Sequence, residues 1–424
     1  MLLSRIFKKQ IAVMFAAALL LAGSAFAQNN EIAHWNRIAT DASLAAQVDP
    51  LAESRIFAIL HLAIHDAVNS IERRYEPYRF QSQTSGEVAI PAVIAAAAHA
   101  VLSELIPAAK PQLDAAFEET LRAIPNADAK TNGLETGRKA ALAILAARKN
   151  DGANRKVERA PGIKLGEYRP TPPDFTPAMF VQWGDITPFV LKSSAQFRPV
   201  PPPKVTSERA LADLEEVKAI GAAKSAIRTE EQSEIARFWY ESSPQGWNRI
   251  AREVAVSQQL DSWESARFFA LVNLAMADGF IGGFEAKYHY NYWRPATALR
   301  ATSDSSWMNY LWTPPVPDYP STHTVLGAAA ATAMAKFFGT DYIDFTMTSG
   351  VPYPGITRKF WSFSEAAREN GASRVFAGIH FSTAVSAGYL QGAQIGEWVF
   401  ENALRPLQAA DKAPLSSNSA ESYR

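Results

Sequence analysis

The sequence contains no cysteine among its 424 residues. Disulfides, thiolate nucleophiles, cysteine-ligated metals and a lipid-anchored cysteine are therefore excluded. It also lacks an excess of either charge, with 42 basic and 42 acidic residues, so composition predicts no nucleic-acid partner and no anionic membrane surface as a partner. With 48% hydrophobic residues, a chain of this length can bury a large core, and we expect a globular protein.

The first 27 residues have the pattern of a Sec-type signal peptide. A basic start is followed by the apolar run 11–21 and by the small-residue sequence Ala-Phe-Ala at 25–27. An uncleaved anchor is the alternative, but the run is shorter than the ~20 residues that a span requires. No other apolar run of spanning length is evident. We therefore expect a periplasmic or secreted protein, soluble after processing, with a net charge of −3.

Composition divides the chain into two helical parts. Residues 28–165 place apolar side chains at helical spacing and predict an N-terminal helical bundle. Residues 166–207 hold nine prolines and several aromatic residues, which favours an ordered connection over a free linker. Helical periodicity resumes over 208–408, the predicted catalytic domain, and residues 409–424 look disordered. The predicted fold class is all-α, built of helical bundles.

Capping signals predict five helices in the second part. Hydroxyl and carboxylate side chains mark helix starts, and glycine or asparagine marks their ends. The expected helices run from Thr229 to Trp239, from Asp261 to Ala277, from Ser321 or Thr322 to Gly339, from Ser362 or Ser364 to Gly371, and from Ser382 or Thr383 to about Leu404.

Three short segments of this part concentrate cations, histidines and a hydroxyl. Forked guanidiniums and a lysine match the equatorial oxygens of a tetrahedral or trigonal oxyanion, whereas buried cations without an anion would repel one another. Two histidines add the groups for in-line chemistry. The segments contribute Lys287 and Arg294, expected on one face of a helix, then Ser321 and His323 at a helix start, then Arg374 and His380.

The ordered pattern Lys-x6-Arg-Pro, Pro-Ser-x-His and Ser-Arg-x3-Gly-x-His resembles a known superfamily, that of the type 2 phosphatidic acid phosphatases and vanadium-dependent haloperoxidases. The proline-rich segment and the run Arg228-Thr229-Glu230-Glu231-Gln232 resemble its soluble bacterial haloperoxidase branch. The resemblance covers roughly residues 40–405 and implies an all-α architecture of helical bundles.

The resemblance also implies a role for each motif residue. His380 would bond vanadium, or attack phosphorus in the phosphatase branch, and His323 would be the acid–base partner on the opposite side. Phe284 and Val316 would line a halide pocket. The oxyanion would be held by Lys287, Arg294, Ser321 and Arg374 with the backbone N–H groups of Thr322 and Gly378, and the carboxylate paired with Arg374 or His323 would be Glu241 or else Asp278.

Two positions within the motifs depart from the superfamily pattern, and outside them Glu241 is a glutamate where aspartate is usual. Thr322 stands where glycine is most frequent, which adds bulk beside the oxyanion. Ala384 stands where an aspartate commonly steadies the histidine four residues earlier, so the tautomer of His380 depends on another acceptor, such as a backbone carbonyl. Separately, His61, His65 and Asp66 have metal-ligand spacing, but no third ligand is evident and the pattern is that of a packed helix.

Three functions remain open on the sequence alone. The favoured hypothesis is an exported haloperoxidase with vanadate as cofactor, using hydrogen peroxide, a halide and an organic acceptor. The alternative is a periplasmic acid phosphatase that forms a phosphohistidine from a phosphate ester and needs no metal. A non-catalytic oxyanion-binding protein is the third, motivated by Thr322 and Ala384. The resemblance also allows a homodimer.

Overall fold

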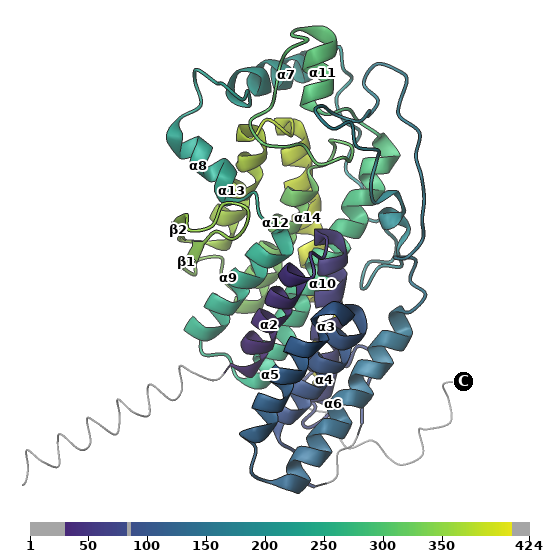
Figure 1. The fold of residues 1–424 in the computed structure, drawn as a ribbon, viewed down its shortest axis with the longest axis vertical. Helices are drawn as coiled ribbons and strands as arrows, with labels where there is room; N and C mark the ends of the chain where they lie inside the picture. The colour runs from purple at the N-terminus through teal and green to yellow at the C-terminus, as the bar shows by residue number, and fades with distance from the viewer. Residues whose placement is uncertain (1–29, 83–85, 409–424) are drawn as a thin grey trace, which may run out of the picture.

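The computed structural model describes residues 30–82 and 86–408, so the predicted signal peptide and C-terminal tail lie outside the described residues. The prediction of an all-α fold is confirmed (Figure 1). The described residues of the first part form five α-helices and a short 3₁₀ turn: α2 (Glu31–Ala45), α3 (Pro50–Asn69), α4 (Ile90–Leu105), η1 (Pro107–Ala109), α5 (Lys110–Arg122) and α6 (Ala127–Arg148).

The second part contains eight α-helices and one small hairpin. Strand β1 pairs antiparallel with β2, and four-residue strands are too short for their alternation to be read from sequence. The elements are α7 (Glu208–Ile220), α8 (Glu230–Phe238), α9 (Ser243–Ser257), α10 (Ser262–Tyr290), α11 (Pro295–Thr302), α12 (Thr322–Phe338), β1 (Phe345–Thr348), β2 (Thr357–Phe360), α13 (Phe363–Phe376) and α14 (Ser382–Asn402).

The predicted helix starts are confirmed more often than the ends. Thr229 caps α8 with a reciprocal capping box, and α12 ends at Gly339 in the left-handed conformation, as expected. Two predicted ends were wrong. Helix α10 continues past Ala277 to Tyr290, and α13 passes through Gly371, where a Cβ would come within 2.9 Å of Val385. That glycine permits close packing and does not end the helix.

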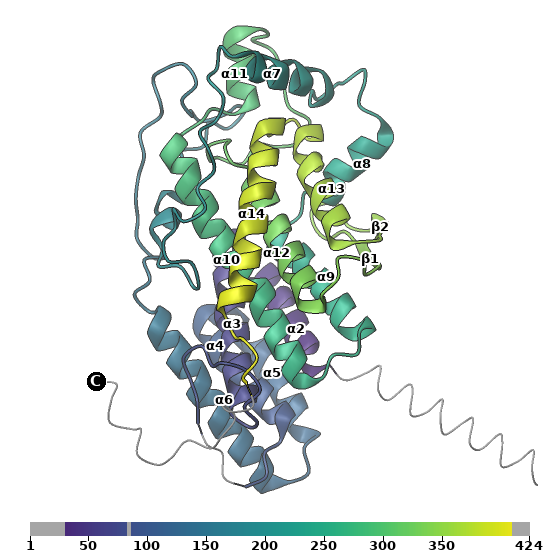
Figure 2. The same cartoon turned by 180° about the vertical axis from the view of Figure 1, so that it is seen from behind.

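Helices α10, α12 and α14 form the centre of the molecule, with α3 packed against α10 (Figures 1 and 2). One hydrophobic cluster runs through both parts of the chain. Helices α12 and α14 approach closely because Gly388 and Gly392 face α12: a Cβ there would meet the carbonyl oxygens of Ser321 and Val325 at 2.5 and 2.2 Å. This contact fixes the start of α12 beside the start of α14.

Helix α10 is long and apolar enough to cross a membrane, which the sequence reading did not anticipate. Its apolar stretch is 94% buried inside the protein. A helix that is apolar on all sides is expected at the centre of a large core as well as in a membrane.

The proline-rich connection lies across the second part, where it forms the 3₁₀ turn η2 (Val181–Asp185) and otherwise runs as an extended segment (Figure 2). Tyrosine hydroxyl groups attach it to the catalytic segments. Tyr290 donates to the carbonyl of Pro199, and Tyr319 donates to that of Val200 at 2.7 Å. The aromatic residues around the motifs therefore hold this connection in place.

A buried polar network joins α2, α3, α9 and α10. Asn36 contacts Nε2 of His61 at 2.8 Å and donates to Asn248 at 2.7 Å, and Asn248 donates to Asn273 at 2.8 Å. His61 is fully buried and stacks on Phe269, and burial lowers its pKa to about 3. The network ties the N-terminal bundle to the catalytic helices.

His65 and Asp66 have structural partners as well. His65 Nδ1 lies 3.0 Å from Asp66, and the same carboxylate accepts from the backbone N–H groups of Tyr78, Arg79 and Phe80. Within residues 30–82 and 86–408, no group of three potential ligand side chains is arranged to hold a metal. The spacing of His61 and His65 therefore reflects helix packing.

Replacing His61 with Gln should flatten the pH dependence of stability. The pKa of His61 in the folded state lies below the ordinary value of 6.5. At a pH between these two values, His61 is therefore protonated in the unfolded state but not in the folded state. The wild-type free energy of unfolding should therefore fall by up to about 1.4 kcal/mol per pH unit as the pH drops below the unfolded value. Urea unfolding measured between about pH 4 and about pH 6 should show that the free energy of unfolding changes less steeply with pH in His61→Gln than in the wild type. The difference should correspond to about one bound proton. The same pH dependence in both proteins would contradict this assignment.

Candidate active site

The three predicted motifs meet at a cavity of about 380 Å³. Its walls come from the starts of α3, α9 and α12, from α10, α13 and the loop before α14, and from the proline-rich connection. Lys287 and Ser321 are fully buried close to it. The predicted residues that line the cavity are Glu241, Phe284, Arg294, Val316, Thr322, His323, Arg374 and His380.

The start of α12 presents donors to this cavity. Thr322 is the first residue of the helix, so its backbone N–H belongs to the turn that has no partner within the helix. The Ser321 hydroxyl accepts from Thr324 at 2.9 Å and makes no capping bond, so its own proton is available for a ligand. Together with the positive end of the helix dipole, these groups favour an anion.

Lys287 and Arg294 do not lie on one helix, so that expectation was wrong. Helix α10 ends at Tyr290 because Asn291 adopts a left-handed conformation with φ of 50°, and Arg294 directly precedes α11. The turn still brings both cations to the loop before α12. Lys287 Nζ donates to the carbonyl of Pro317 at 2.6 Å, and Arg294 Nε donates to that of Val316 at 2.7 Å. Both side chains therefore shape this loop as well as supplying charge.

Arg374 is the least satisfied cation of the site. It is 4% exposed, and its Nη1 donates to the carbonyl of Trp239 at 3.2 Å. Its Nε and Nη2 atoms are buried with no hydrogen-bond partner in the part of the chain that the structure describes. Burial lowers its pKa to about 10. Unpaired buried guanidinium donors are costly, and an anionic ligand would satisfy them.

The predicted carboxylate partner of Arg374 or His323 was wrong for both candidates. Glu241 pairs instead with Arg249 at 2.9 Å and accepts from the backbone N–H of Gly350 at 2.8 Å. Asp278 accepts from the backbone N–H groups of residues 189–191 at 2.7 to 3.0 Å and so anchors the proline-rich connection. Chain spacing alone could not show that these nearer donors occupy both carboxylates.

His323 is oriented by a residue that sequence reasoning missed. Its Nδ1 lies 2.6 Å from Oγ of Ser243, the first residue of α9. Its Nε2 is buried without a hydrogen-bond partner among the described residues. Burial, with Arg374 nearby, holds the pKa of His323 well below its usual range. The ring is therefore neutral and can exchange a proton with a ligand at Nε2. The only sequence signal for Ser243 is its position at a helix start.

His380 contacts a cation on one ring nitrogen and a carboxylate on the other. Arg294 Nη1 lies 2.9 Å from Nε2, and Asp318 Oδ1 lies 2.9 Å from Nδ1. Because a guanidinium only donates, this contact assigns the lone pair to Nε2 and the proton to Nδ1. Burial and the nearby Arg294 hold the pKa of His380 well below its usual range. The nearby acceptor is thus Asp318, not the backbone carbonyl suggested from sequence.

Gly378 has a different role from the one expected. Its backbone N–H donates to the carbonyl of Val375 at 2.9 Å, so it is occupied in a turn and does not serve a ligand in this structure. The residue has φ of 76°, and a Cβ there would come within 2.1 Å of the carbonyl oxygen of Gly221. Only glycine fits this close approach, which shapes the loop before His380.

The bulk of Thr322 is accommodated by α10. A Cβ on Gly283 would lie 2.7 Å from the Thr322 methyl group, so this methyl fills the space that the absent side chain leaves. Its backbone N–H remains at the first turn of α12. The departure at this position therefore adds bulk toward α10.

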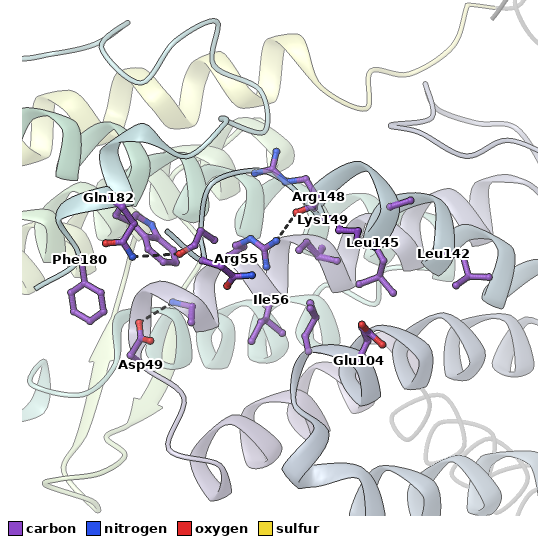
Figure 3. A pocket seen from close by; sticks show the side chains of 17 residues that line it. Asp49, Arg55, Ile56, Glu104, Leu142, Leu145, Arg148, Lys149, Phe180 and Gln182 are labelled. Carbon is purple, nitrogen blue, oxygen red and sulfur yellow. Dashed lines mark hydrogen bonds between the residues drawn. The ribbon is translucent and has the colours of Figure 1, made fainter. Parts of the chain in front are cut away.

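A larger cavity of about 630 Å³ lies between α3, α4, α6 and η2 (Figure 3). Its buried charged groups have partners: Arg55 Nε donates to Asp151 at 2.7 Å, and Arg148 pairs with the same carboxylate at 2.9 Å. Phe180 borders both cavities. The smaller cavity is the candidate active site, because it brings both motif histidines together with Arg374, whose Nε and Nη2 are buried without partners among the described residues.

The charges of this site fit a doubly charged oxyanion. Lys287, Arg294 and Arg374 bring three basic side chains, whereas Asp318 is the carboxylate in contact with His380. Both histidines are neutral, so the buried excess is positive and matches vanadate or phosphate.

Comparisons with known proteins agree with this geometry. A family model described as the second helical-bundle domain of VCPO matches residues 267–409. The vanadium chloroperoxidase of Curvularia inaequalis is 27% identical over 226 residues, which span 38% of this chain and 37% of that protein. The match therefore covers well under two thirds of that relative.

Solved structures match over most of the chain. The crystal structure of the first bacterial vanadium-dependent iodoperoxidase has a TM-score of 0.81 and 27% identity, covering 89% of this chain and 97% of that one. A holo-type bacterial vanadium-dependent chloroperoxidase has a TM-score of 0.67 and 20% identity, covering 83% of this chain and 91% of that one. At that identity the second match shows a shared fold.

Phosphate should stabilise the protein through Arg374. A ligand that binds only the folded state at about 100 times its Kd adds about 2.7 kcal/mol to the free energy of unfolding. Arg374→Met should lose most of this gain, while its stability without phosphate should equal or exceed that of the wild type because a buried unpaired cation is removed. Thermal unfolding with phosphate or with chloride at equal ionic strength measures both effects.

Arg155→Met is the matched control, because Arg155 is exposed and pairs with Asp185 away from the cavity. It should keep the full phosphate effect. An identical phosphate effect in Arg374→Met and wild type would contradict the assignment of the site.

Proposed function

Because the chain belongs to the vanadium haloperoxidase family, we propose that it is an exported enzyme that oxidises a halide with hydrogen peroxide, with vanadate as cofactor. The observation that supports this most directly is the buried guanidinium of Arg374, whose unpaired donors face the same cavity as His323 and His380. A trigonal or tetrahedral oxyanion satisfies these groups at once.

Each residue would have a distinct task around the oxyanion. Nε2 of His380 would supply the lone pair that holds the central atom. Arg374 and Ser321 would donate to its oxygens, and the charged form of Lys287 would be favoured once an anion offsets the burial that lowers its pKa. Bound vanadate supplies the Lewis acidity that activates hydrogen peroxide. His323, oriented by Ser243, holds and transfers a proton at Nε2.

Part of the cavity lining is apolar and suits the halide and an organic acceptor. Phe280 and Phe284 contact each other edge to face, and Phe284 also meets Phe180 of the connection. Val316 and Trp312 line the same cavity. Apolar lining beside fixed polar groups is typical of a small-molecule site.

Hydrolysis of a phosphate ester is the second candidate. The lone pair on Nε2 of His380 is the observation that favours it, because the same atom could attack phosphorus to form a phosphohistidine. His323 would then protonate the leaving group. Phosphate and vanadate share their charge and geometry, so the binding groups serve both reactions.

Two assays distinguish halide oxidation from hydrolysis of a phosphate ester. Protein loaded with orthovanadate should halogenate a phenol dye in the presence of peroxide and a halide, and added phosphate should suppress the reaction by competing for the site. His380→Ala should lose at least about 100-fold in this activity, because the atom that binds the cofactor is removed.

His289→Ala is the matched control, since His289 lies between Lys287 and Arg294 in the first motif but is not among the residues that line the cavity. It should keep the activity. Release of phosphate from an aromatic phosphate ester, with no halogenation under vanadate, would favour the phosphatase. Full halogenation by His380→Ala would overturn both.

A further inference from the structure

We propose that Asp318 is the positioning residue of His380, and that it supplies from the loop before α12 the carboxylate that position 384 lacks. This proposal rests on the proposed function, in which Nε2 of His380 binds the oxyanion. It names a residue and a task that the motif pattern does not assign.

Asp318 and Nδ1 of His380 are buried side by side with few other partners. Asp318 is fully buried, and neither of its carboxylate oxygens has an aligned side-chain hydrogen bond within the described residues; the nearby donor from the backbone is Phe381. Nδ1 of His380 lies 2.9 Å from Asp318 Oδ1 and has no aligned hydrogen bond of its own among the described residues. A buried carboxylate with few donors is costly, and a small rotation of the ring would give it an aligned bond from Nδ1.

The Asp318 backbone is held at both its N–H and its carbonyl group. Its N–H donates to the carbonyl of Tyr292 at 2.9 Å, and its carbonyl accepts from Nζ of Lys287 at 3.0 Å. Both partners belong to the Lys287–Arg294 segment, at and just beyond the end of α10. The cation of the first motif therefore fixes the residue that meets the histidine of the third motif.

When an oxyanion is bound, Asp318 is the group left to hold the proton on Nδ1 of His380. In this structure Arg294 contacts the Nε2 lone pair, and that contact alone would select the Nδ1–H tautomer. An oxyanion bound at Nε2 uses the same lone pair, so it displaces the Arg294 contact. Asp318 then remains as the group that holds the proton on Nδ1 and the ring in orientation.

Position 384 offers no acid to the His380 ring. Ala384 is buried in the first turn of α14, and its carbonyl accepts from the backbone N–H of Ser321 at 2.9 Å. Helix α14 thus provides no carboxylate one turn after His380, and the carboxylate that contacts the ring comes from Asp318 in the loop before α12. An aspartate at position 384 should therefore be able to replace Asp318 in holding the ring of His380 and its Nδ1 proton.

The test compares Asp318→Ala with the double variant Asp318→Ala/Ala384→Asp. Calorimetric titration with orthophosphate and with orthovanadate should show Asp318→Ala weakened by about 10- to 100-fold, and the double variant should recover most of this loss. ¹⁵N NMR of histidine-labelled protein should show His380 protonated on Nδ1 in the wild type with phosphate bound, and a mixture of tautomers in Asp318→Ala.

Asp213→Asn is the matched control. Asp213 is also buried and close to Asp318, but it pairs with Arg209 and does not contact His380. It should leave affinity and tautomer unchanged. Asp318→Asn keeps the size of the side chain and covers the case in which Asp318→Ala does not fold. This variant should lose affinity in the same direction.

The proposal is overturned if Asp318→Ala, or Asp318→Asn in its place, keeps the wild-type tautomer and binds phosphate within about 2-fold of wild type. It is also overturned if the folded double variant recovers nothing. These readouts need no turnover, so a protein that binds phosphate through His380 but oxidises no halide would contradict the proposed function alone.

Discussion

Positive charge buried without a matching carboxylate is the constraint on which the site depends. Two donor atoms of Arg374 have no hydrogen-bond partner in the described structure. Most of the N–H groups of Lys287 and Arg294 donate to backbone carbonyls. Such a cluster reduces the stability of the empty protein, because each cation loses hydration and repels the others. The fold maintains it only because the surrounding helices are held by other contacts, chiefly the core around α10 and the close approach of α12 and α14. The buried cations of the site therefore lower the stability of the protein without ligand and strengthen the binding of an anion.

The local features of this chain could be predicted from sequence, because they depend on neighbours within a few residues. The Thr229 cap and the Gly339 end are of this kind, as are the first turn of α12 with Ser321 before it. Features set by distant contacts could not be predicted. The left-handed Asn291 separates Lys287 from Arg294, and Arg249 captures Glu241; neither leaves a periodic signal. Ser243 and Asp318 contact the two histidines across 80 and 62 residues of chain, so only the fold identifies them.

Both departures from the motif pattern have a structural counterpart on another element. The methyl group of Thr322 occupies the space left by Gly283 of α10. The missing acid at Ala384 is matched by Asp318, whose carboxylate contacts the ring from the loop before α12. In each case the change at one position is offset by a residue that adjoins it in space and not in sequence.

The partners of the two histidines help to decide whether the protein is an enzyme or a non-catalytic oxyanion-binding protein. A chain that had lost turnover would have no reason to keep a buried carboxylate beside Nδ1 of His380, since burying Asp318 without an aligned donor is costly by itself. Nor would it keep Ser243 at 2.6 Å from His323, because anion binding needs charge and donors but not an oriented acid–base pair. Both histidines have a specific partner on the ring nitrogen Nδ1, while Nε2 of His323 has no hydrogen-bond partner among the described residues and Nε2 of His380 contacts Arg294, which a bound oxyanion would displace. That arrangement is expected of a site that performs chemistry on its oxyanion, and it argues against a site that only holds one.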